Sequence, residues 1–151
     1  MISICYSNIL TSKCDILVNP VNCFGVMGAG LAKQFARQYP EYEQVYKELC
    51  NKRSLKMGEI NIYHGLELPC IGICSLPTKY HWRDKSRLEP ITKSCKKLRE
   101  YLDEKGYSCA IPALGCGLGG LDFAVVKDMI YTVFNECKSF IEFYAPGDFA
   151  V

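Results

Sequence analysis

Apolar and β-branched residues gather in six short runs along the chain. Runs of this length and composition are typical of β-strands. The predicted strands are Ile2 to Tyr6, Asp15 to Asn19, Glu59 to Tyr63, Cys70 to Ser75, Ser108 to Ile111 and Phe140 to Tyr144.

Between these runs, apolar residues recur at helical spacing. The predicted helices are Gly30 to Tyr39, Glu41 to Cys50, Arg87 to Lys105 and Asp122 to Cys137. Strands that alternate with helices favour an α/β fold, with a central mixed sheet covered by helices on both faces in three layers. The length fits one domain, which we expect to span residues 1–151 as a monomer.

Ten cysteines lie mostly in the apolar runs, and no basic, apolar leader precedes them. We interpret them as reduced, buried thiols of an intracellular, cytoplasmic protein. Zinc is the competing interpretation, but the chain has only two histidines and its closest cysteines are Cys70 and Cys74, so no metal or cofactor is predicted. No stretch approaches the roughly 20 apolar residues of a membrane span, so no membrane contact is predicted.

Two predicted strands run into glycine-rich loops and then helices: the first glycine loop, residues 25–30, and the second glycine loop, residues 113–120. Ligands of such sheets bind at the carboxyl ends of the strands, and a helix N-terminus with free N–H groups suits a phosphate. Glycine also serves tight turns, so each loop alone leaves a purely structural role open. Neither loop has the Walker A spacing, and G-x-G-x-x-G does not occur after the first strand, so nucleotide triphosphate hydrolysis and Rossmann dinucleotide binding are both disfavoured.

The segments that contain Asn8, Asp15 to Asn22, Gly25 to Gly30 and Ala113 to Gly120 resemble the ADP-ribose-binding macrodomain family over nearly the whole chain. Leu76 to Arg83 and Gly119 to Phe123 resemble the subgroup of terminal ADP-ribose glycohydrolases, which includes antitoxins that act on DNA. The resemblance implies a three-layer α/β/α fold that binds ADP-ribose without a metal.

The resemblance also implies a role for individual residues. Asn8 and Ile9 would border the adenine together with Tyr144, although many members have Asp where this chain has Asn8. Asn22 would contact the distal ribose. The loops that hold the diphosphate and ribose would comprise Gly25, Val26, Met27, Gly28, Ala29, Gly30, Leu114, Gly115, Cys116, Gly117, Leu118 and Gly119.

The chemistry that the resemblance implies rests on Lys79 as the nucleophile at C1″ of the distal ribose and on Asp122 as the residue that assists release. A lysine attacks only as the neutral amine, and a carboxylate can move the proton. From spacing alone, Lys79 fits a basic surface and Asp122 fits a helix N-cap. A thiol nucleophile at Cys116 is disfavoured for want of a paired histidine motif.

Eight of the eighteen basic residues fall within residues 79–99 and would steer DNA toward the site, or would form a solvated helix face. Trp82 and His81 would line a substrate channel or cover the core. Three functions compete: a glycohydrolase that frees ADP-ribose from DNA or protein, an ADP-ribose 1″-phosphate phosphatase, and a non-catalytic ADP-ribose reader. The pair Lys79 and Asp122 favours the glycohydrolase.

Overall fold

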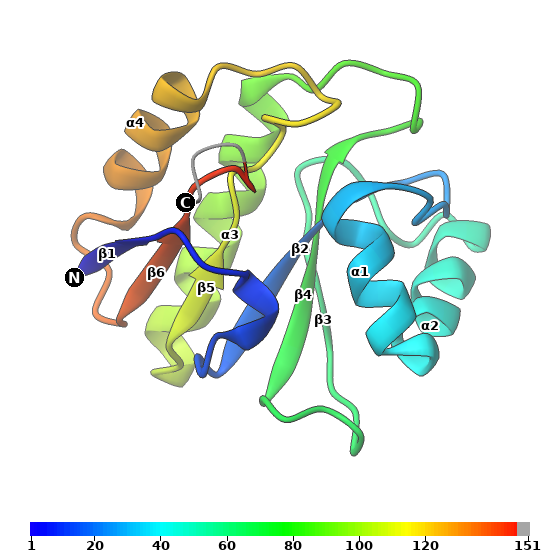
Figure 1. Ribbon diagram of the computed structural model, residues 1–151, viewed down its shortest axis with the longest axis horizontal. Helices are drawn as coiled ribbons and strands as arrows, with labels where there is room; N and C mark the ends of the chain where they lie inside the picture. Colours follow the sequence, from blue (N-terminus) through cyan, green and yellow to red (C-terminus); the bar gives the residue numbers. More distant parts are fainter. Residues whose placement is uncertain (148–151) are drawn as a thin grey trace.

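Six strands form one mixed sheet in the order β1-β6-β5-β2-β4-β3, as the computed structural model, which describes residues 1–147, shows in Figure 1. Every neighbouring pair is parallel except β3 and β4. The central mixed sheet that the sequence predicts is therefore confirmed. The strands are β1 (Ile2–Cys5), β2 (Ile16–Asn22), β3 (Asn61–Tyr63), β4 (Gly72–Lys79), β5 (Cys109–Ile111) and β6 (Ile141–Tyr144).

Two pairs of helices cover the two faces of the sheet and complete three layers (Figure 1). One buried cluster joins the sheet to α3 and α4, and a second joins the opposite face to α1 and α2. The helices are α1 (Gly30–Gln38), α2 (Pro40–Asn51), α3 (Leu88–Lys105) and α4 (Phe123–Phe134), with a short 3-10 helix, η1 (Ile9–Thr11), after β1.

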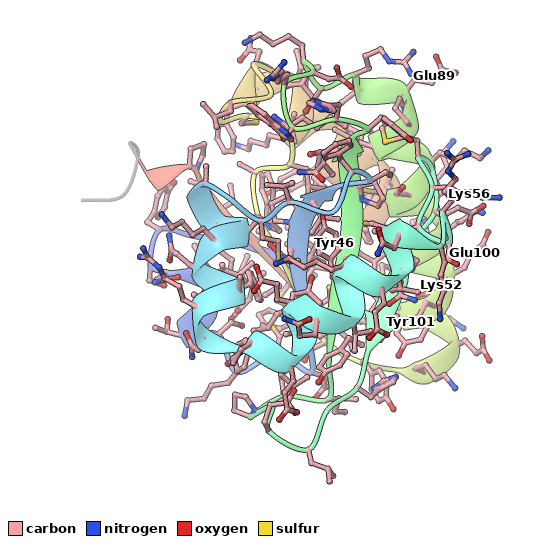
Figure 2. The ribbon with its side chains drawn as sticks, turned by 90° about the vertical axis from the view of Figure 1, so that its right-hand side faces the viewer. Tyr46, Lys52, Lys56, Glu89, Glu100 and Tyr101 are labelled. Carbon is pink, nitrogen blue, oxygen red and sulfur yellow. The ribbon has the colours of Figure 1, made fainter. Side chains whose placement is uncertain are left out.

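Helix α3 shows how the apolar stripe sets this arrangement. Its buried side chains are Ile91, Ser94, Cys95, Leu98 and Leu102, which recur at helical spacing and face the sheet. Its exposed face carries charge, and Figure 2 shows Glu89 and Glu100 on the outer rim of the molecule. On the opposite layer, the same view places Tyr46 of α2 on the inner side of its helix.

Strands β2 and β5 are neighbours that separate at their carboxyl ends. They pair only through Ile16 with Cys109 and Leu17 with Ala110, and prolines 20 and 112 follow where pairing has ceased. Strand β2 leads into α1 on one face, whereas β5 leads into α4 on the other. Such a switch point opens a crevice beyond the carboxyl ends of the strands, and both glycine loops lie there.

Candidate functional site

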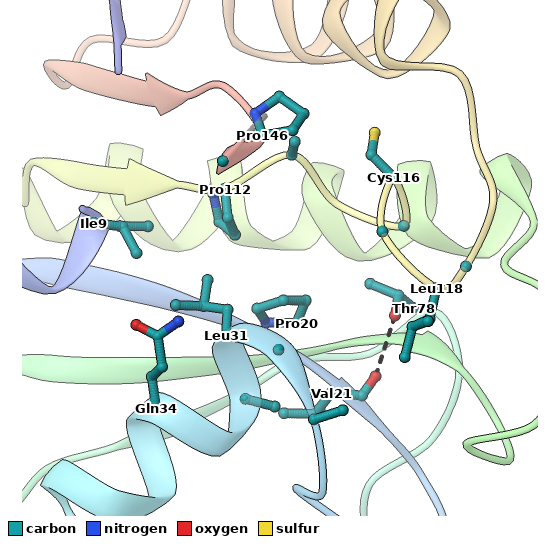
Figure 3. A pocket seen from close by; sticks show the side chains of 18 of the residues that line it. Ile9, Pro20, Val21, Leu31, Gln34, Thr78, Pro112, Cys116, Leu118 and Pro146 are labelled. Carbon is teal, nitrogen blue, oxygen red and sulfur yellow. Dashed lines mark hydrogen bonds between the residues drawn. The ribbon is translucent and has the colours of Figure 1, made fainter. Parts of the chain in front are cut away.

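A cavity of about 840 Å³ occupies this crevice. Figure 3 shows Leu31 and Gln34 of α1 on one side, with Pro112, Cys116 and Leu118 on the other. Small-molecule sites usually measure about 300–1,000 Å³. The cavity is therefore large enough for an extended nucleotide-sized ligand.

The first glycine loop is organised by Asn22, the last residue of β2. Its Oδ1 accepts hydrogen bonds from the backbone N–H groups of Phe24, Gly25 and Val26 at 3.0, 3.0 and 3.3 Å, and its Nδ2 donates to the carbonyl of Val26 at 2.7 Å. The Tyr46 hydroxyl, 2.8 Å from the Asn22 carbonyl and 2.9 Å from Oδ1, supports it from α2. Asn22 lines the cavity and fixes the loop that forms part of its wall.

Helix α1 begins at the cavity without a side-chain cap. Its N-cap residue is Ala29, its first turn contains no acidic residue, and Gly28, Ala29 and Gly30 line the cavity. Alanine is a poor N-cap because it offers no acceptor for the first free N–H groups. Within residues 1–147, the N–H groups of these three residues donate to no other residue. They leave a ready site for an anion.

The second glycine loop packs directly on Ser86, which lies in the loop between β4 and α3. A Cβ atom on Gly119 would lie 2.2 Å from Ser86 Oγ and 2.6 Å from the Gly115 carbonyl oxygen, so no larger residue fits. A Cβ atom on Gly117 would meet nothing within 4 Å. Gly119 is therefore required by packing, whereas Gly117 borders open cavity.

Lys79 is the only charged side chain among the residues that line the cavity, as far as the structure describes the chain. A register shift in the β2–β4 ladder pairs Val21 with Pro77 and Asn22 with Lys79, so Thr78 is skipped in the register, although its hydroxyl donates to the Val21 carbonyl at 3.4 Å. This bulge brings Lys79 level with Asn22, and bulges commonly re-aim a side chain at a site. The Lys79 amine has no ion pair or hydrogen bond with any residue in the range 1–147.

The other end of the cavity is formed near β1 and β6. Ile9 is buried and Tyr144 is 5% exposed, and both line the cavity with Asn8. Asn8 caps η1, because its Oδ1 accepts from the Leu10 N–H at 3.0 Å. The Tyr144 hydroxyl donates to Glu142 at 2.8 Å, and burial raises the pKa of Tyr144.

The Macro domain family model matches residues 18–130. The chain belongs to the macrodomain family. A "DNA ADP-ribosyl glycohydrolase" of Thermus aquaticus is 39% identical over 125 residues, which cover 82% of this macrodomain and 35% of that protein. The chain thus spans about a third of the length of this curated relative.

Solved structures agree with the family assignment. The "Macrodomain of Mycobacterium tuberculosis DarG" is 34% identical and superposes with a TM-score of 0.92 over 97% of this chain and 98% of that one. "Thermosipho africanus DarTG in complex with ADP-ribose" is 27% identical, with a TM-score of 0.91 over 99% of this macrodomain and 43% of that chain. The three-layer macrodomain fold expected from the sequence is confirmed.

Most of the predicted binding residues line the cavity of this macrodomain. Those that do are Asn8, Ile9, Asn22, Val26, Gly28, Ala29, Gly30, Gly115, Cys116, Gly117, Leu118, Gly119 and Tyr144. Three others lie outside the lining: Met27 and Leu114 are buried in the two cores, and Gly25 packs toward Cys50, where its positive φ of 101° favours glycine.

The two predicted catalytic residues have different surroundings in the macrodomain. Lys79 lines the cavity, whereas Asp122 is exposed, lies outside the lining and caps α4 by accepting from the Ala124 N–H at 3.0 Å. The geometry thus brings Lys79 and Asn22 together and leaves Asp122 in a capping role. The catalytic assignment of Asp122 stays a prediction.

Sequence reasoning overlooked Ser86. It is 7% exposed and lines the cavity, and its Oγ has no hydrogen-bond partner among the described residues. A lone serine in a charged loop carries no pattern that distinguishes it from a solvated one. The glycines at positions 115 and 119 were the available signal, because their missing side chains leave the space that Ser86 fills.

Cysteines are mainly buried side chains in this macrodomain. Seven of the ten are buried, and those described form no disulfide. No group of three potential metal ligands occurs within residues 1–147. None of the helices in that range is long and apolar enough to cross a membrane.

Proposed function

We propose that this chain binds ADP-ribose and hydrolyses the bond between the distal ribose and an ADP-ribosylated base in DNA. The observation that carries the proposal is the position of Lys79, the one charged residue among the described lining residues, beside Asn22 at one end of a cavity bordered by two glycine loops. The glycohydrolase name of the Thermus relative supports the reaction and the DNA substrate.

In the proposed complex, the diphosphate lies at the start of α1. The free N–H groups of Gly28, Ala29 and Gly30 border the cavity that the second glycine loop also lines, and no carboxylate lines it within residues 1–147 to repel an anion. The adenine packs near Ile9 and Tyr144. The distal ribose then lies beside Asn22, with C1″ toward Lys79.

The proposed chemistry differs from that of most glycoside hydrolases. Those enzymes use two carboxyl groups that flank the bond, and among the described residues none lines this cavity. The neutral Nζ of Lys79 supplies the electron pair instead. Its bond to C1″ forms as the bond from C1″ to the base breaks, and the departing base takes up the proton that the newly bonded Nζ loses. Water then cleaves the C1″–Nζ bond, which releases ADP-ribose and restores the amine.

We include Asp122 as the residue that assists release, on the family resemblance alone. Its cap on α4 gives a sharp test, because Asn caps a helix about as well as Asp but cannot carry the proton. Asp122→Asn should keep the wild-type unfolding midpoint and lower kcat by about tenfold or more. Wild-type turnover in Asp122→Asn would restrict Asp122 to capping.

The central experiment compares Lys79→Ala with Lys105→Ala, which removes an exposed lysine near the end of α3. Release of ADP-ribose from modified DNA should fall on the order of 10²–10⁴-fold in Lys79→Ala, whereas Lys105→Ala should match wild type. Calorimetry should show that Lys79→Ala still binds free ADP-ribose within about threefold of wild type, since the N–H groups that hold the diphosphate are intact.

The same variants should be assayed on ADP-ribosylated protein and on ADP-ribose 1″-phosphate. Cleavage of the phosphate ester that survives Lys79→Ala, without release from DNA, would overturn the glycohydrolase proposal in favour of a phosphatase. If the protein binds ADP-ribose but cleaves none of these substrates, the result would support the function of a non-catalytic ADP-ribose reader.

A further inference from the structure

Two exposed aromatic side chains and a half-buried histidine gather beside Lys79 and the cavity. We call Phe24, His81 and Trp82 the aromatic rim. Phe24 is 52% exposed and Trp82 is 44% exposed. The Phe24 and His81 ring centroids lie 4.4 Å apart, and those of His81 and Trp82 lie 5.2 Å apart in a stacked arrangement. Trp82 also lines the cavity, so the alternative in which it covers the core is excluded.

Hydrogen bonds hold the rim in place. The Cys23 N–H donates to the carbonyls of Lys79 and Tyr80 at 3.2 and 2.9 Å, which joins the chain before the first glycine loop to the chain after β4. The His81 N–H donates to Asp84 at 2.9 Å, and the Arg83 N–H donates to His81 Nδ1 at 3.1 Å. The exposed rings of Phe24 and Trp82 are therefore held on a fixed backbone, which lowers the entropy lost when a ligand binds.

The rim is surrounded by positive charge. The guanidinium carbon of Arg83 lies 4.6 Å from the centre of the Trp82 ring. Lys85 and Arg87 are exposed in the same loop and, with Lys79, line a smaller hollow of about 160 Å³. Asp84, the only acidic residue of residues 79–88, has its carboxylate engaged with the His81 N–H. The surface thus combines exposed rings with a local excess of cations.

We propose that the aromatic rim and Arg83 bind the nucleotides next to the modified base in single-stranded DNA. An unpaired neighbouring base stacks on the Trp82–Arg83 unit, and backbone phosphates contact Arg83 and Lys85. Rings beside cations match a single strand, because its bases expose their faces whereas those of a duplex stay stacked inside. This inference rests on the proposed function, since the modified base must leave from the Lys79 end.

The test uses two single-stranded pentanucleotides that carry the same central ADP-ribosylated base. In the first, the nucleotides on either side of the modified base are ordinary ones. In the second, those flanking nucleotides are abasic but keep the same phosphates. For the wild-type protein, kcat/KM should be about tenfold higher on the first oligonucleotide, mainly through a lower KM. Each stacked base is expected to raise the affinity several-fold or more. Trp82→Ala should abolish the difference, and Trp82→Phe should retain most of it.

Phe140→Ala is the matched control, because Phe140 is 41% exposed and precedes β6, at the end of the sheet away from the cavity. It should keep the wild-type ratio between the two oligonucleotides. Calorimetry with free ADP-ribose shows separately whether Trp82→Ala has altered the cavity itself. In Arg83→Gln, the dependence of log KM on log salt should become shallower by about 0.7.

Equal kcat/KM on both oligonucleotides would overturn this inference and leave the glycohydrolase proposal standing. The inference would also be overturned if the ratio of kcat/KM between the two oligonucleotides fell as much in Phe140→Ala as in Trp82→Ala. If wild type binds free ADP-ribose but cleaves neither oligonucleotide, the DNA substrate of the proposed function fails, and the inference fails with it.

Discussion

Gly117 and Gly119 stand two positions apart in the second glycine loop, but they are glycines for different physical reasons. A methyl group on Gly119 would collide with Ser86 and with the Gly115 carbonyl, whereas a methyl group on Gly117 would point into open cavity. Gly119→Ala should therefore lower the free energy of unfolding by about 1–3 kcal/mol, as overpacking does. Gly117→Ala should stay within about 0.5 kcal/mol of wild type.

The affinity for free ADP-ribose should also differ between Gly117→Ala and Gly119→Ala. If the diphosphate lies against Gly117, the added methyl group should weaken binding of free ADP-ribose by about tenfold or more, although the fold is intact. Urea unfolding and calorimetry on the two variants measure both effects. Wild-type affinity in Gly117→Ala would show that the ligand does not approach this part of the loop.

At the scale of elements, the uncapped start of α1 predicts a trade between stability and binding. Asp at position 29 would accept hydrogen bonds from the first turn, and the extended backbone of Ala29 already has N-cap geometry. Ala29→Asp should raise the free energy of unfolding by about 0.5–2 kcal/mol. The carboxylate would also occupy the N–H groups and repel an anion, so affinity for ADP-ribose should fall by about tenfold or more.

Ala29→Asn is the matched control for charge, because it caps the helix as well but stays neutral. It should gain comparable stability and lose less affinity than Ala29→Asp. Thermal unfolding with and without ADP-ribose compares the three proteins directly. Equal affinity in wild type and Ala29→Asp would place the anion away from α1.

The elements themselves were largely predictable from the spacing of apolar residues, and the exceptions have identifiable causes. The predicted strand ended at Ser75, but β4 continues to Lys79. Proline has no N–H for a ladder, but β3 pairs with β4 only as far as Ser75, so the missing N–H of Pro77 breaks no bond with β3. The α4 helix ends at Phe134 rather than Cys137, and η1 was too short for a periodic signal.

At the scale of the molecule, the end of the sheet that holds the site could be predicted, because strand ends that run into glycine loops gather at one edge. The position of the eight basic residues within residues 79–99 could not be predicted, because those in α3 lie apart from those in the loop before it. Lys97 pairs with Glu59, and Arg99 pairs with Asp103 along α3. The cations near the cavity are instead at the end of β4 and in the loop after it, so we expect DNA steering from residues 79–87.

Buried thiols in both cores make the whole fold sensitive to alkali. Burial raises the pKa of Cys14 and of Cys23 to about 11, and it raises the pKa of the fully buried Cys95 as well. Above pH 9, the thiols of the unfolded chain lose protons that the folded protein keeps, so the free energy of unfolding should fall as pH rises from about 9 to about 11. The slope is bounded by about 1.4 kcal/mol per pH unit for each thiol.

Cys95→Ala tests this origin of the alkaline sensitivity, with Val133→Ala as the control for loss of buried volume, since both side chains belong to the same core. Both variants should be less stable than wild type at pH 8. Only Cys95→Ala should show a shallower decline in urea-unfolding free energy between pH 8 and pH 10, because it removes a titrating group. A decline that is equally steep in all three proteins would assign the alkaline loss to tyrosine and lysine ionisation instead.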